Sequence, residues 1–167
     1  YPLVWRRFLL RTTGTTFADL HRAIQDACGW WDYHLYRFDE ATPRGLVGLA
    51  QSPVEIEEWF DGTPAADDVP LARWVGKFAP RACHYLYDFG DDWDHDVTVE
   101  KVLARDGVGS VPACIAGKRA CPPEDCGGIW GYPNFIQAIE NPDHERHEEL
   151  LEWIGGSFDP ETFDPAA

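Results

Sequence analysis

Residues 83–99, "CHYLYDFGDDWDHDVTV", alternate apolar and polar side chains on both sides of an acidic turn. Such alternation is typical of strands that lay one face on a core. We predict a three-residue hairpin loop at 90–92, which places Tyr87 opposite His95. One face of the hairpin is then almost wholly apolar, with Tyr85, Tyr87, Phe89, Trp93, His95, Val97 and Val99. A chain containing this hairpin must cover that face with another layer.

The opposite face of the hairpin is acidic. The same register places Asp88 opposite Asp94, with Asp96 beside them. Like charges in direct cross-strand contact are unfavourable unless they are solvated, share a proton or are bridged by a cation. A solvated outer face is the simpler interpretation. His95, on the aromatic face, is either a hydrogen-bonded core residue or a ligand or proton-transfer group, because imidazole titrates near neutral pH.

Other segments show helical or strand periodicity. Residues 16–28 carry apolar side chains at helical spacing, with Thr16 and Asp19 as a capping box and Gly29 as the stop. The remaining predictions are strands at 3–12, 30–39 and 45–51, a short helix at 70–78, a Gly-, Pro- and Cys-rich loop at 110–133, a helix with Pro133 in its first turn and a helix around 147–154. We therefore predict an α+β fold, with an antiparallel or mixed β-sheet packed against a helix in a β-grasp-like arrangement, a C-terminal helical pair and the long loop.

Length and composition indicate one domain spanning residues 1–167, since 44% hydrophobic residues suffice for a single packed core. No apolar run approaches the roughly 18 residues of a membrane span, and the start lacks the features of a signal peptide. These observations favour the cytoplasm. The chain contains no methionine, so we expect that residue 1 is not the natural start.

The net charge argues against direct DNA binding. Lys and Arg number 14 against 29 Asp and Glu, which gives a formal charge of −15 at pH 7. A surface of this sign repels a phosphate backbone. We expect a protein or small-molecule partner and no membrane, and basic groups or metal ions suit the charge best.

Three of the five cysteines lie close together in the long loop, as C-x6-C-x4-C at Cys114, Cys121 and Cys126. Structural zinc sites usually open with C-x2-4-C, so the pattern leaves three interpretations open: buried structural thiols, a zinc site and a redox pair. The zinc hypothesis takes these three thiolates and His95 as a Cys3His tetrahedron that orders the loop. Zinc is the one cofactor that the sequence suggests.

The hairpin and the "GGIWGYP" segment together supply aromatic and acidic side chains for a pocket. The candidate residues are Tyr87, Asp88, Trp93, Asp94, His95, Trp130 and Tyr132. We predict a binding or adaptor module that uses this pocket. The alternative is a metal-dependent hydrolase, in which Asp88, Asp94 or Asp96 and a histidine hold a divalent ion that activates water. No nucleophile elbow or kinase motif set accompanies these residues, which favours the binding module over an enzyme.

Several blocks resemble the plasmid pRiA4b ORF-3-like family, among them "TFADLHRAIQDACGWWDYHLYRFD", "YLYDFGDDWDHDVTVEKVL" and "CIAGKRACPPEDCGGIWGYPNF". The resemblance covers nearly the whole chain. It implies an α+β fold with an antiparallel sheet and an association with mobile elements, and it brings no settled activity. Family members usually carry one more strand ahead of "WRR", so the resemblance also implies that an N-terminal strand is missing here.

Overall fold

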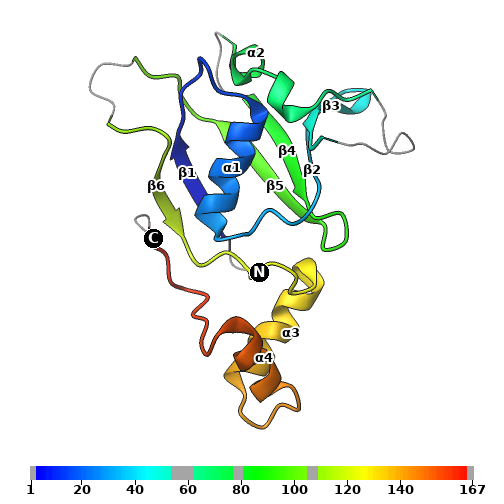
Figure 1. Cartoon of the computed structure of the whole chain (residues 1–167), viewed down its shortest axis with the longest axis vertical. Helices are drawn as coiled ribbons and strands as arrows, with labels where there is room; N and C mark the ends of the chain where they lie inside the picture. Colours follow the sequence, from blue (N-terminus) through cyan, green and yellow to red (C-terminus); the bar gives the residue numbers. More distant parts are fainter. Residues whose placement is uncertain (1–2, 54–61, 77–80, 105–108, 165–167) are drawn as a thin grey trace.

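The computed structural model describes residues 3–53, 62–76, 81–104 and 109–164 of the chain. Helices are interspersed among the strands along the chain, and the last two helices are set apart at one end (Figure 1). The strands are β1 (Trp5–Leu9), β2 (Tyr36–Thr42), β3 (Gly45–Gln51), β4 (Arg81–Tyr87), β5 (Trp93–Val99) and β6 (Ala113–Lys118). The helices are α1 (Phe17–Cys28), the 3-10 helix η2 (Ala66–Asp68), α2 (Leu71–Val75), α3 (Gly128–Glu140) and α4 (His147–Ile154).

The described strands form two antiparallel sheets, which confirms the predicted α+β fold class. One sheet has the order β3-β2-β4-β5, and the other pairs β1 with β6. Helix α1 crosses the four-stranded sheet (Figure 1), where the rings of Phe17 and Phe38 have centroids 5.0 Å apart and His21 stacks on Tyr36 at 3.6 Å. The centre of the hydrophobic core lies between α1 and this sheet.

Helix α1 begins and ends where the sequence predicts. Thr16 caps it by accepting from the Asp19 N–H, and the Asp19 carboxylate accepts from the Thr16 N–H in return. Gly29 ends it in the left-handed conformation, with φ 73°. Its inward face buries Phe17, Ala18, Leu20, His21, Ile24 and Gln25. Each fully buried large apolar side chain on this face contributes about 1.5–3 kcal/mol to folding.

The predicted hairpin exists, but its predicted register is wrong by two residues. Tyr87 pairs with Trp93 and Tyr85 with His95, so the connection spans residues 88–92. Asp88 leaves the strand in a left-handed conformation, φ 56°, and its carboxylate accepts from the Gly90 N–H at 2.9 Å. A shift of two residues preserves the alternation of faces. The aromatic and acidic faces are therefore as predicted, whereas Asp94 lies opposite Leu86 and not Asp88.

Three other predicted elements differ from the structure. The strand predicted at 30–39 begins only at Tyr36, and the residues before it form a loop. The predicted long loop contains β6. This strand pairs with β1, which lies far away near the start of the sequence. The short helix predicted at 70–78 spans Leu71–Val75, and residues 77–80 lie outside the described part.

The two C-terminal helices pack on each other and on the tail that follows them. Helix α3 starts at Gly128, so Pro133 lies inside it and not in its first turn. Phe135 meets Trp153 of α4 at 5.7 Å and Phe158 of the tail at 5.6 Å between ring centroids. Among the described residues, no helix has both the length and the apolar character needed to cross a membrane.

Candidate functional site

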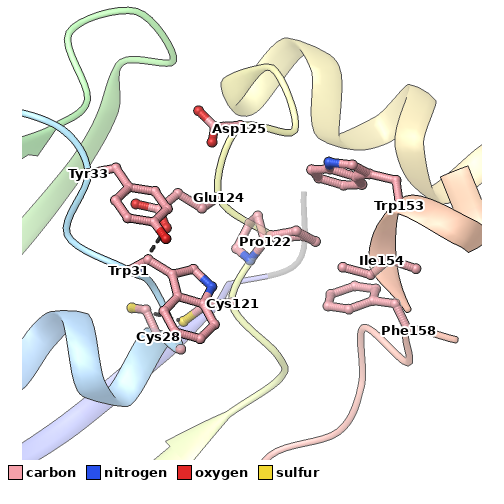
Figure 2. Close-up of a pocket in the computed structure, with 12 residues that line it drawn as sticks. Cys28, Trp31, Tyr33, Cys121, Pro122, Glu124, Asp125, Trp153, Ile154 and Phe158 are labelled. Carbon is pink, nitrogen blue, oxygen red and sulfur yellow. Dashed lines mark hydrogen bonds between the residues drawn. The ribbon is translucent and has the colours of Figure 1, made fainter. Parts of the chain in front are cut away.

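A pocket of about 420 Å³ opens where the segment after α1, the loop before α3 and the end of α4 come together (Figure 2). The described residues that line it are Cys28, Gly29, Trp31, Tyr33, Cys121, Pro122, Pro123, Glu124, Asp125, Trp153, Ile154 and Phe158. Three distant parts of the sequence therefore build one site.

Hydrogen bonds between the two loops fix the shape of the pocket. The indole N–H of Trp30 donates to the Pro122 carbonyl at 2.8 Å, and the Trp31 backbone N–H donates to Glu124 Oε2 at 2.7 Å. The Tyr87 hydroxyl donates to the other carboxylate oxygen of Glu124. Burial and the bond to Glu124 raise the pKa of Tyr87, so the phenol stays protonated and remains a donor. Glu124 is thus held in place on both sides.

The pocket combines exposed aromatic rings with carboxylates. Trp31 and Tyr33 are each 73% exposed and Trp153 is 47% exposed. Figure 2 shows Glu124 beside Tyr33, with Asp125 on the same loop. Aromatic faces attract cations through their quadrupole, and carboxylates add charge-assisted hydrogen bonds. This composition suits a positively charged group with a flat or aliphatic body.

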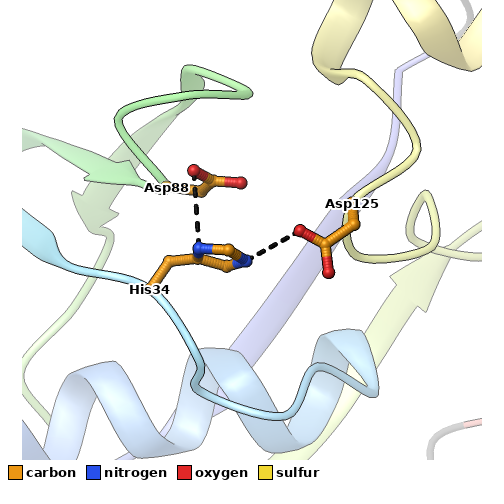
Figure 3. A group of neighbouring side chains, drawn as sticks. All are labelled: His34, Asp88 and Asp125. Carbon is orange, nitrogen blue, oxygen red and sulfur yellow. Dashed lines mark hydrogen bonds and ion pairs between the residues drawn. The ribbon is translucent and has the colours of Figure 1, made fainter.

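At the edge of the pocket, His34 lies between two carboxylates (Figure 3). Its Nε2 is 2.9 Å from Asp125 Oδ1, and its Nδ1 is 3.7 Å from Asp88 Oδ1. A neutral imidazole carries a single N–H, so one of these contacts is repulsive unless the ring is protonated or a cation lies nearby. Within the described ranges, this is the one group of three metal-ligating side chains whose ligand atoms all lie within 4.8 Å of one another.

Three predicted pocket residues of the hairpin, Tyr87, Trp93 and His95, are not among the residues that line this pocket. All three contact Trp30, whose ring stacks on Tyr87 at 5.0 Å, meets Trp93 at 6.0 Å and meets His95 edge-on at 5.5 Å. His95 Nδ1 lies 3.1 Å from the Tyr85 carbonyl and 3.0 Å from that of Trp93. Burial lowers the pKa of His95. This is the hydrogen-bonded histidine that the sequence offered as one alternative.

The remaining predicted pocket residues are dispersed. Asp94 is on the outer face of the sheet, where its exposed carboxylate lies 3.6 Å from His84 Nδ1, and Asp88 has joined His34 instead. Trp130 projects from α3 and is 83% exposed, whereas Tyr132 is buried against Phe158. The acidic residues predicted to act together thus form two separate groups.

The four residues of the zinc hypothesis are not brought together in the described structure. Cys121 Sγ lies 3.1 Å from Cys28 Sγ, and Cys114 Sγ contacts the Ala116 carbonyl at 3.6 Å. Cys126 lies near Asp91, and burial raises its pKa to about 12. No group of metal-ligating side chains found among the described residues contains any of these cysteines or His95.

Sequence patterns alone assign no role to the residues that matter most in the pocket. The strand predicted at 30–39 includes Trp31, Tyr33 and His34 as regular positions. Aromatic side chains fall on both faces of that predicted strand, and this failure to alternate is the available signal that the segment is a loop. Glu124 and Trp153 have no distinguishing pattern, because their role depends on contacts with residues far away in the sequence.

The similarity to known proteins covers nearly the whole chain. The chain is 37% identical to a protein of unknown function from Methanosarcina mazei Go1, MM3350, whose crystal structure superposes with a TM-score of 0.81 and covers 99% of this chain and 89% of that one. It is also 39% identical over 156 residues to the uncharacterized protein y4hQ of Sinorhizobium fredii, which covers 93% of this chain and 76% of the relative. The family profile described as plasmid pRiA4b ORF-3-like protein matches residues 1–167. The chain therefore belongs to the plasmid pRiA4b ORF-3-like protein family.

Proposed function

We propose that this protein is a cytoplasmic binding module that holds an arginine side chain of a basic partner segment in the pocket between Trp31 and Trp153. The observation that carries the proposal is the pairing of exposed aromatic rings with Glu124 and Asp125 around one opening. A guanidinium group stacks on aromatic faces and also donates forked hydrogen bonds to carboxylates. Both kinds of contact are available here.

The charge of the whole molecule supports a basic partner. The formal charge of −15 attracts positively charged segments over distances of about one Debye length, roughly 8 Å at physiological salt. The same field disfavours phosphate-bearing ligands at this opening. Arginine is favoured over lysine because its planar group covers a tryptophan ring more fully and is more weakly hydrated.

Calorimetric titration with capped arginine peptides tests this proposal. The probe is N-acetyl-Gly-Arg-Gly-amide, and the comparison peptide carries citrulline, which has nearly the same shape without the charge. We expect the citrulline peptide to bind about five- to thirtyfold more weakly, since a cation–π contact contributes roughly 1–2 kcal/mol. Equal affinity for the two peptides would contradict recognition of the guanidinium.

Variants locate the binding site. Trp31→Ala and Asp125→Asn should each lower the affinity for the arginine peptide by about three- to tenfold. Trp130→Ala is the matched control, because Trp130 is also a highly exposed tryptophan but does not line the pocket. If Trp130→Ala lowers the affinity as much as Trp31→Ala does, the peptide binds elsewhere.

A metal-dependent hydrolase is the second candidate, and the arrangement around His34 favours it. One histidine and two carboxylates within 4.8 Å of one another are a suitable partial ligand set for a divalent cation. Its test is the change in melting temperature with MnCl2 or ZnCl2, compared between the wild type, Asp88→Asn and the control Asp94→Asn, followed by turnover of phosphoester and ester substrates. Stabilisation that Asp88→Asn abolishes supports the site, and its absence in the wild type contradicts it.

A further inference from the structure

We propose that Cys28 and Cys121 are a site of reversible oxidation, which hydrogen peroxide converts into a disulfide in the wall of the pocket. Their Sγ atoms are 3.1 Å apart, although the residues are 93 positions apart in the sequence. Figure 2 shows the two sulfur atoms facing each other, next to the Trp31 ring in this view. Both residues line the pocket, which gives a small oxidant a route to them.

The backbone on either side already holds the two sulfurs near bonding distance. Cys28 is the last residue of α1, and Gly29 fixes the end of that helix by donating to the Asp26 carbonyl. On the other side, the bond from Trp30 to the Pro122 carbonyl anchors the loop that carries Cys121. A disulfide has an S–S length of about 2.05 Å, so the sulfurs need to approach by only about 1 Å. The proposal requires side-chain rotations in these two segments to supply this movement.

Arg6 gives the two thiols different roles. Its side chain donates to the Ala27 and Lys118 carbonyls, which places the guanidinium beside the pair. The hydrogen bond with Cys28 and the charge of Arg6 lower the pKa of Cys121, in spite of its burial. The contact with Cys121 and burial raise the pKa of Cys28. We take Cys121 as the attacking thiol, because Arg6 interacts with its sulfur by charge and by a side-chain hydrogen bond, and the thiolate is the reactive form.

The reaction balances with one equivalent of peroxide. The Cys121 thiolate attacks one peroxide oxygen, the O–O bond breaks, and the departing hydroxide takes a proton to leave as water. Cys121 is then a sulfenic acid. The Cys28 sulfur attacks that sulfur, the S–S bond forms, the S–O bond breaks, and the hydroxyl leaves as a second water with the proton from Cys28. A dithiol reductant reverses the step by thiol–disulfide exchange and is itself oxidised to a disulfide.

A short contact between two thiols also occurs in two other kinds of site, and each of them would react differently. A purely structural thiol pair would keep its S–H···S contact and resist stoichiometric peroxide. A zinc site would need further ligands, and within the described residues the clusters of metal-ligating side chains do not include this pair. Treatment with peroxide therefore distinguishes the redox pair, the structural thiol pair and the zinc site.

The test uses the full chain, reduced with dithiothreitol, desalted without oxygen and treated with one equivalent of hydrogen peroxide. We expect two of the five thiols to be lost, a mass decrease of about 2 Da, and a peptide map of the non-reduced protein that links Cys28 to Cys121. Dithiothreitol should restore all thiols. Five retained thiols, a link through Cys114 or Cys126, or thiols protected by stoichiometric zinc would each overturn the proposal.

Two variants assign the order of attack. In Cys28→Ser the reaction should stop at a sulfenic acid on Cys121, which dimedone traps, whereas Cys121→Ser should give at least about tenfold less trapped product on Cys28. Cys114→Ser is the control and should form the disulfide as the wild type does. Equal trapping in the two variants would contradict the order of attack. These readouts are covalent, so they are independent of the outcome of the arginine-peptide titration, and the mapping of the wild type needs no variant to fold.

Discussion

At Gly128 the backbone passes so close to the hairpin turn that a side chain has no room. A β-carbon there would lie 2.0 Å from the Asp91 carbonyl oxygen, and the residue also has φ 64°. The Asp91 carboxylate accepts from the neighbouring Gly127 N–H at 2.9 Å. One aspartate of the turn therefore positions the start of α3. The sequence identifies this residue only as part of a turn, because its partner lies 36 positions away.

Gly128→Ala should lower the free energy of unfolding by about 3 kcal/mol or more, measured in urea. The left-handed conformation alone costs roughly 1–2 kcal/mol for alanine, and the collision with Asp91 adds to it. Gly155→Ala is the matched control, since Gly155 has φ 86° and a β-carbon on it would have no neighbour within 4 Å. Equal losses in the two variants would mean that the hairpin and α3 do not touch at this point.

At the scale of elements, a buried histidine is one of the side chains that attach α1 to the four-stranded sheet. His21 stacks on Tyr36, its Nδ1 lies 2.7 Å from the Tyr85 hydroxyl, and its Nε2 lies 2.7 Å from Asp32 Oδ1. Burial is the largest effect on this ring and lowers the pKa of His21 below its ordinary value of 6.5. The folded protein therefore keeps His21 neutral where the unfolded chain would protonate it.

We expect the free energy of unfolding to fall as the pH decreases from 7 to 5. Below about pH 6.5 the unfolded chain binds a proton that the folded chain refuses, and each such group contributes a slope of up to about 1.4 kcal/mol per pH unit. His21→Gln should reduce the slope, measured by urea unfolding across this range. A comparison at pH 8 gives the cost of the substitution itself. An unchanged slope in the variant would show that His21 is not the group responsible.

Periodicity predicts those elements that bury one regular face, and it fails where distant partners decide the structure. Helix α1 and the hairpin faces follow directly from spacing and alternation. Strand β6 lies between Pro- and Gly-rich residues and is a strand only because β1 pairs with it. The residues that line the observed pocket differ from the predicted set, because the sequence gives no sign that Cys28 and Cys121, or Trp31 and Glu124, are neighbours.

At the scale of the whole molecule, the excess of acidic side chains weakens the folded state. Mutual repulsion among the excess carboxylates opposes compaction, and salt screens it. We expect the melting temperature to rise by at least about 2 °C between roughly 10 and 500 mM NaCl. The same increase in NaCl concentration should lower the affinity of the protein for the arginine peptide. A melting temperature that falls with NaCl would show that attractive ion pairs dominate.

The tail after α4 returns to the two-stranded sheet. Phe163 lies under the guanidinium of Arg6 at 4.4 Å, and a β-carbon at Gly117 of β6 would meet its ring at 2.6 Å. The helical pair therefore leaves from the end of β6 and comes back to β6, as an excursion with both ends fixed at one place (Figure 1). In evolutionary terms, the connection between α3 and α4 is free to gain or lose residues without disturbing strand pairing. Length differences among family members should accordingly gather at residues 141–146 and be rare at 119–127.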